Sequence, residues 1–77
     1  MNKVLVFGVS DCPGCVELLA LLIRKSIKYD YYNVKTKEGL TILASYGLAD
    51  EEMSPVVTDE KGNLLDFDKF VAEVEQL

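Results

Sequence analysis

Histidine and tryptophan are both absent from this sequence of 77 residues, which contains only two cysteines and two prolines. Without histidine, the pair Cys12 and Cys15 provides only two of the four Cys or His ligands that a structural zinc site usually needs. Two cysteines this close together also build no disulfide scaffold. The pair therefore points to redox chemistry, or to a metal shared with a second copy of the chain or an external ligand.

Long apolar runs and an excess of positive charge are missing too. No run approaches the roughly 20 apolar residues that span a bilayer, and residues 1–9 lack the features of a signal peptide. Thirteen Asp and Glu against eight Lys and Arg give a formal charge of -5, which repels phosphate backbones. We therefore expect residues 1–77 to form one monomeric, cytoplasmic domain without a nucleic-acid or membrane partner.

The apolar residues and turn formers predict an α/β fold. Their order favours β-α-β-α-β-β-α, a mixed four-stranded sheet flanked by three helices, with helices on both faces. The first two strands should be parallel and the last two should form an antiparallel hairpin. The predicted elements are a strand over 3–9, a helix over 13–26, a strand over 28–34, a helix from the N-cap Thr36 to about Tyr46, a strand over 55–58, a short strand starting at 64–65, and a last helix capped by Asp66 or Asp68.

The same pattern predicts which side chains face the core. The main apolar stripe of the first helix is expected to be Val16, Leu19, Ala20, Ile23 and Ile27, widened by Leu18, Leu21 and Leu22. The second strand carries Tyr29, Tyr31 and Tyr32, which we interpret as sheet packing.

The chemistry is expected at Cys12-Pro13-Gly14-Cys15, where a strand ends and a helix begins. Residues i and i+3 of a helix are neighbours, so a small adjustment brings the two sulfurs to disulfide distance. The helix N-terminus favours a thiolate at Cys12, whereas Asp11 and Glu17 disfavour it through their negative charge. We expect Cys12 to act as the nucleophile and Cys15 as the resolving thiol, with Pro13 and Gly14 shaping the substrate-facing turn between them.

With this motif, an amphipathic helix after it and Ser54-Pro55 before a strand, nearly the whole chain resembles the thioredoxin superfamily, in particular its short glutaredoxin-like branch. The resemblance implies a cis Ser54–Pro55 peptide bond beside the cysteines. It also implies that Ser54 offers its backbone to the substrate, and we expect Met53 to line the same groove. The implied activity is protein-disulfide reduction, without a bound cofactor, by a dithiol electron carrier that a reductase recharges.

The source of electrons stays open between a thioredoxin-type reductase and glutathione. Typical glutaredoxins have Tyr where this chain has Gly14, and a Gly-Gly-Asp-type segment where it has Leu64-Leu65-Asp66. These departures favour a thioredoxin-like carrier over a glutathione-dependent glutaredoxin, which is the first alternative. The second alternative is a non-enzymatic metal or iron–sulfur module assembled through Cys12 across a dimer.

Overall fold

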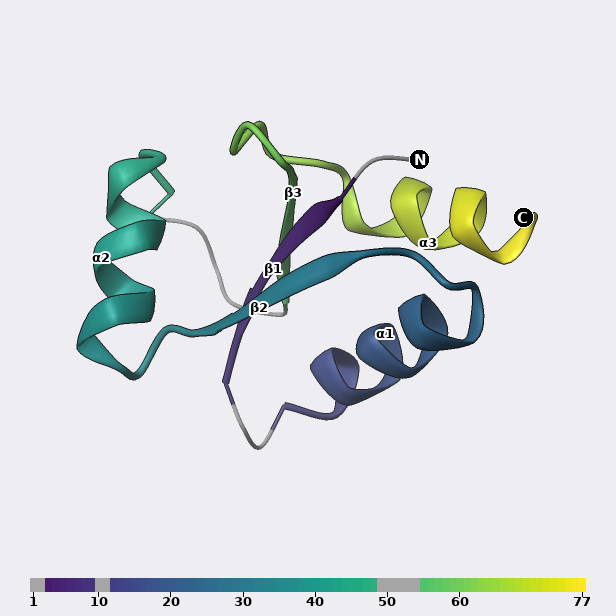
Figure 1. Ribbon diagram of the computed structural model, residues 1–77, viewed down its shortest axis with the longest axis horizontal. Coiled ribbons are helices and arrows are strands. Elements are labelled where there is room, and N and C mark those ends of the chain that lie inside the picture. The colour runs from purple at the N-terminus through teal and green to yellow at the C-terminus, as the bar shows by residue number, and fades with distance from the viewer. Residues whose placement is uncertain (1–2, 10–11, 49–54) are drawn as a thin grey trace.

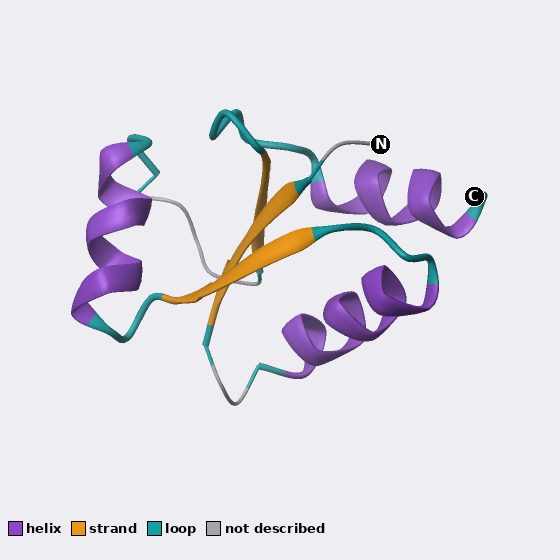
Figure 2. Cartoon of the chain, viewed as in Figure 1, coloured by secondary structure: helices purple, strands orange, loops and turns teal. Residues whose placement is uncertain are grey.

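Three helices surround a three-stranded mixed sheet in the computed structural model, which describes residues 3–9, 12–48 and 55–77 (Figures 1 and 2). The helices are α1 (Pro13–Arg24), α2 (Lys37–Ser45) and α3 (Phe67–Glu75), and the strands are β1 (Val4–Gly8), β2 (Tyr29–Asn33) and β3 (Val56–Asp59). The α/β class and the order of these six elements are as predicted.

The first strand, β1, lies at the centre of the sheet, whose strand order is β2-β1-β3. It pairs in parallel with β2, from Val4 opposite Tyr29 to Gly8 opposite Asn33. It pairs in the antiparallel sense with β3, where Phe7 lies opposite Val56. The predicted parallel arrangement of the first two strands is confirmed.

Helices cover both faces of the sheet, with α1 and α3 on one side and α2 on the other (Figure 1). Successive side chains of a strand point to opposite faces, so β1 contributes to two separate apolar layers. The layer under α1 and α3 consists of Val4, Val6, Leu18, Leu21, Leu22, Ile27, Val57, Phe70 and Val74. The layer under α2 consists of Leu5, Phe7, Leu43, Leu48 and Val56. These two layers explain why successive residues of β1 are apolar instead of alternating with polar residues.

The core-facing side of α1 differs from the predicted stripe. Val16 and Ile23 are 61% and 65% exposed, whereas Leu18 and Leu22 are almost completely buried. The helix is apolar around much of its circumference, so its periodicity alone did not identify the buried side. Packing against the sheet decided it. Cys15 lies against Gly8 of β1, and Leu18 and Leu22, which follow at helical spacing on the same side of α1, belong to the buried layer.

The predicted fourth strand is wrong, because within the described residues the sheet ends at β3. Leu64 makes only an isolated antiparallel bridge with Thr58. The adjacent Leu65 donates one backbone hydrogen bond to Val57, with an N···O distance of 2.9 Å. At the next residue, the Asp66 side chain accepts a hydrogen bond from the Lys69 N–H at 3.0 Å and caps α3. The returning chain therefore enters the helix before it can extend the hairpin.

The predicted helix caps are confirmed where α2 and α3 begin. Thr36 caps α2 by accepting a hydrogen bond from the Gly39 N–H at 3.0 Å, and Asp66 caps α3. Gly39, which weakens the helical pattern of α2, is needed for close packing. A Cβ atom there would overlap the backbone carbonyl of Asn33.

Candidate functional site

The cysteine pair lies at the junction between β1 and α1. Cys12 is the N-cap of α1, with extended backbone angles (φ -89°, ψ 113°), and its Sγ accepts a hydrogen bond from the Cys15 N–H at 3.2 Å. Its carbonyl accepts from the Val16 N–H, and Pro13 occupies the first helical turn, where no N–H needs an intrahelical partner. The N-cap therefore orients the Cys12 sulfur toward the helix, beside Cys15.

The two cysteines, both free thiols, differ in their access to solvent. Cys12 is half-buried, whereas Cys15 is 2% exposed. Burial raises the pKa of the Cys15 thiol to about 11, and a hydrogen bond with Cys12 adds to this rise. The Val9 backbone acts in the opposite direction and lowers the pKa of Cys15. At neutral pH Cys15 is therefore a protonated thiol, and Cys12 is the sulfur that is more accessible to solvent.

The raised pKa of Cys15 predicts that the reduced protein loses stability in alkaline solution. Between pH 9, the ordinary pKa of this thiol, and about 11, its value in the fold, the unfolded chain has released the proton that the native protein keeps. The unfolded state then binds fewer protons, so the free energy of unfolding falls as pH rises. Urea unfolding across this pH range measures the slope. Cys15→Ala, which removes the titrating group, should flatten it, and an equal slope in that variant would contradict the assignment.

Gly8, at the end of β1, makes room for the buried sulfur. A Cβ atom at this position would overlap Cys15 Sγ, and it would lie 3.4 Å from Cys15 Cβ. The absence of a side chain at Gly8 therefore allows the backbone of β1 to lie close to Cys15. Sequence analysis missed this residue, although a glycine inside an apolar strand is itself a signal of a close backbone approach.

The sheet register brings Pro55 to the same end of the sheet as the cysteines. Because Phe7 lies opposite Val56 in the antiparallel pair, the preceding Pro55 follows on toward Gly8, and it is buried. Pro13 is exposed and Gly14 is half-buried beside Cys12. Met53, Ser54 and the isomer of the Ser54–Pro55 bond lie outside the described residues, as does Asp11.

Tyr31 is a further residue near the dithiol, which sequence analysis assigned only to sheet packing. Its Cε1 atom lies 3.7 Å from the position that a Cβ of Gly8 would occupy. Cys15 Sγ lies close to the same position. Burial raises the pKa of the Tyr31 hydroxyl, and the charges of Cys15 and Cys12 raise it further. The alternation of side chains along β2 could have indicated this face, since Tyr29 and Tyr31 share it while Tyr32 points to the other side.

No group of three or more Cys, Asp or Glu side chains is arranged to hold a metal ion within residues 3–9, 12–48 and 55–77. In the same part of the chain, no helix combines the length and apolarity needed to cross a membrane.

Comparison with known proteins provides no family for this chain. No family model, no curated protein and no solved structure matches it. The function must therefore be argued from the geometry of the dithiol and its surroundings.

Proposed function

We propose that the protein is a thiol–disulfide oxidoreductase that reduces protein disulfides by a dithiol mechanism. The observation that carries the proposal is the asymmetry of the pair. Cys12 Sγ lies at a helix N-terminus, accepts a hydrogen bond from the Cys15 N–H and is partly exposed to solvent. Cys15 lies one helical turn further along and is buried. This arrangement suits a first thiol that attacks and a second that resolves.

The proposed reaction begins when the Cys12 thiolate attacks a substrate disulfide. A Cys12–substrate disulfide forms, and the other substrate sulfur leaves as a thiolate that takes a proton from water. Cys15 then attacks Cys12 Sγ, which forms the Cys12–Cys15 disulfide and breaks the bond to the substrate. The departing substrate sulfur takes up the proton that Cys15 loses. The substrate gains two electrons and two protons, and the dithiol loses them.

The raised pKa of Cys15 gives the second step a characteristic pH dependence. Burial disfavours the Cys15 thiolate that resolves the mixed disulfide, so release of the reduced substrate should accelerate as pH rises through the alkaline range. The same burial shields Cys15 from reagents that have not first reacted with Cys12.

The fold supports a thioredoxin-like assignment within the α/β class. A parallel β1–α1–β2 unit places the cysteines at the start of α1, and β3 runs antiparallel beside β1. Pro55 precedes β3 at the end of the sheet where the dithiol lies, which supports the proposed substrate-binding role of this proline. The fourth strand expected of such a domain is reduced to an isolated bridge between Thr58 and Leu64, which is a departure from that topology within the described residues.

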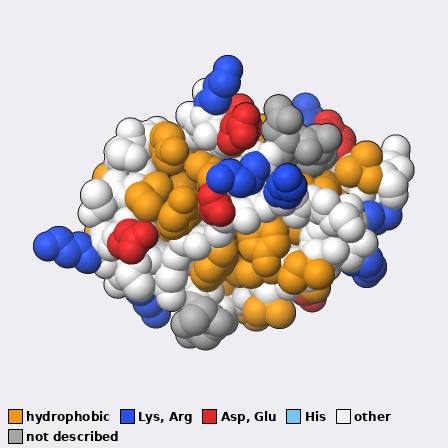
Figure 3. Space-filling view, in the orientation of Figure 1, with side chains coloured by type: hydrophobic (Ala, Val, Ile, Leu, Met, Phe, Trp, Pro, Cys, Tyr) orange, Lys and Arg blue, Asp and Glu red, His pale blue; other side chains and the backbone are white. Residues whose placement is uncertain are grey.

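The surface beside the dithiol supports a protein substrate. Hydrophobic side chains gather over α1 and β2 (Figure 3), and Val16, in the turn that follows Cys12, is 61% exposed. An apolar surface that begins one helical turn from Cys12 can bury a polypeptide around its disulfide. The proposed partners are therefore a disulfide-containing protein and a reductase that returns Cys12–Cys15 to the dithiol, in a cytoplasmic setting.

The proposal is tested by following two thiols through a redox cycle. The reduced protein should contain two reactive thiols, lose both when it reduces a model protein disulfide, and regain both with a reductant. Parallel assays with NADPH-linked thioredoxin reductase and with glutathione identify the electron donor, and we expect the reductase to be the more effective. A dithiol that does not cycle reversibly would refute the proposal, and metal content with visible absorbance in the purified protein would favour a metal module instead.

A further inference from the structure

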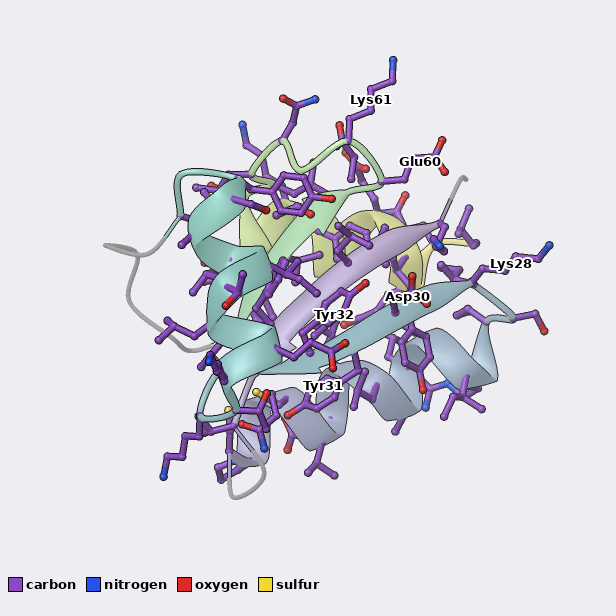
Figure 4. All side chains as sticks on the ribbon, turned by 60° about the vertical axis from the view of Figure 1, so that its left-hand side comes forward. Lys28, Asp30, Tyr31, Tyr32, Glu60 and Lys61 are labelled. Atoms are coloured by element: carbon purple, nitrogen blue, oxygen red, sulfur yellow. The ribbon has the colours of Figure 1, made fainter. Side chains whose placement is uncertain are left out.

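The Tyr31 ring occupies a defined place between β2 and the dithiol. Tyr31 lies opposite Val6 in the parallel pair and packs against the apolar layer under α1 and α3. Its Cε1 atom and Cys15 Sγ both adjoin the space above Gly8, which has no Cβ of its own. In Figure 4, Tyr31 lies on the side of β2 that faces α1, and Tyr32 lies on the other side. The ring is therefore the β2 neighbour of the buried sulfur.

The electrostatic contacts of Tyr31 identify the same neighbours. After burial, the groups that raise the pKa of its hydroxyl are Cys15 and then Cys12, both at the start of α1. β1 presents Val6 and Gly8 to this side, and neither titrates. The two thiols are thus the titratable groups that act on the Tyr31 hydroxyl from the elements packed against it.

We propose that Tyr31 is a positioning residue that shields the Cys15 sulfur from water on the β2 side and thereby governs how readily Cys15 resolves a mixed disulfide. The inference rests on the proposed thiol–disulfide function. Because Gly8 has no side chain, Cys15 Sγ can lie against β1. The Tyr31 ring, on the neighbouring strand β2, packs beside the same space and separates it from solvent. The cover keeps the sulfur buried and thereby favours the protonated form of Cys15.

Removing the cover should make Cys15 ionise more easily. Tyr31→Ala admits water to the sulfur, so the pKa of Cys15 should fall from about 11 toward its ordinary value of 9.0. Each unit of that fall raises the thiolate fraction at neutral pH about tenfold. Because a less basic thiolate is a weaker nucleophile, the release of substrate should accelerate only about threefold per unit.

The chain offers matched controls on the same strand. Tyr31→Phe keeps the ring, so it should retain the alkaline titration of Cys15. Tyr29→Ala removes an equal ring from the same face of β2, away from the dithiol, and should leave that titration unchanged. The titration is measured in the reduced, substrate-free protein by thiolate absorbance, with Cys15→Ala used to assign the signal. An unshifted Cys15 in folded Tyr31→Ala, or an equal shift in Tyr29→Ala, would overturn the inference.

A second measurement uses only folded protein and remains decisive if Tyr31→Ala is unstable. Formation of the Cys12–Cys15 disulfide removes the two ionisable thiols, so the pKa of the Tyr31 hydroxyl should fall on oxidation. Tyrosinate absorbance should therefore appear at lower pH in the oxidised protein, and Tyr31→Phe should abolish this difference. An unchanged difference in Tyr31→Phe would reject Tyr31 as the neighbour of the dithiol. These titrations need no substrate. A failure of this inference can therefore be distinguished from a failure of the proposed function, in which the dithiol does not cycle.

Discussion

Cys12→Ser should abolish disulfide reduction, whereas Cys15→Ser should leave the protein covalently joined to its substrate. The reason is the different position of the two sulfurs: Cys12 is partly open at the N-cap, and Cys15 is 2% exposed behind it. A serine hydroxyl is far weaker as a nucleophile than a thiolate at neutral pH. Without Cys12 no mixed disulfide can form, and without Cys15 none can be resolved.

Non-reducing electrophoresis and mass measurement check this expectation directly. Cys15→Ser should accumulate a one-to-one adduct with the model substrate that a reductant releases, and Cys12→Ser should show none. The double variant Cys12→Ser/Cys15→Ser is the control for adducts unrelated to the pair. An adduct at Cys15 in the Cys12→Ser variant would reverse the assigned roles. The absence of any adduct with Cys15→Ser would remove the support for a dithiol mechanism.

Gly8→Ala should destabilise the reduced protein by about 1–3 kcal/mol, the usual range when an extra methyl group is forced into a packed interior. The new Cβ would overlap Cys15 Sγ, and neither neighbour can move freely. Gly8 belongs to the central strand, and Cys15 is held in the first turn of α1. The variant should also slow the proposed resolving step, since relief of the overlap displaces the sulfur that we propose attacks Cys12.

A double-mutant cycle separates this overlap from a general effect of alanine on β1. Cys15→Ala removes Sγ and leaves a Cβ at 3.4 Å from the added methyl group, which is ordinary van der Waals contact. Gly8→Ala should therefore cost much less in the Cys15→Ala background than in the native chain, with a coupling energy of about 0.5–3 kcal/mol. Urea unfolding of the four proteins measures it. Equal costs in both backgrounds would show that Gly8 does not accommodate Cys15.

Local chemistry made much of this structure predictable. Thr36 and Asp66 were recognisable as helix caps because each can accept a hydrogen bond from an N–H three residues ahead. The apolar run over residues 4–7 does not alternate with polar residues, a pattern typical of a strand covered on both faces. The position of Cys12 at a helix start followed from Pro13 and the turn formers around it.

Two incorrect expectations depended on contacts between distant segments. Leu64 and Leu65 have the residue types of a strand, but the capping of α3 by Asp66 draws the chain away from β3 after one bridge. The sequence also did not determine which side of α1 is buried. Val16 and Leu18 are both apolar, and only packing against the sheet makes one exposed and the other buried. Periodicity indicates a helix, but a helix that is apolar on several sides does not specify which side is buried.

The sequence by itself determined that the chain has a cysteine pair at a strand–helix junction, with the first cysteine at the N-cap. Those features depend on residues within one turn of each other, whose hydrogen bonds and backbone preferences are local. Only the tertiary structure decided that Cys15 is buried against Gly8 and that Tyr31 of β2 lies beside it. Burial and the pKa of a thiol depend on which segments surround it, and chain folding brings Gly8, Cys15 and Tyr31 together from three separate elements.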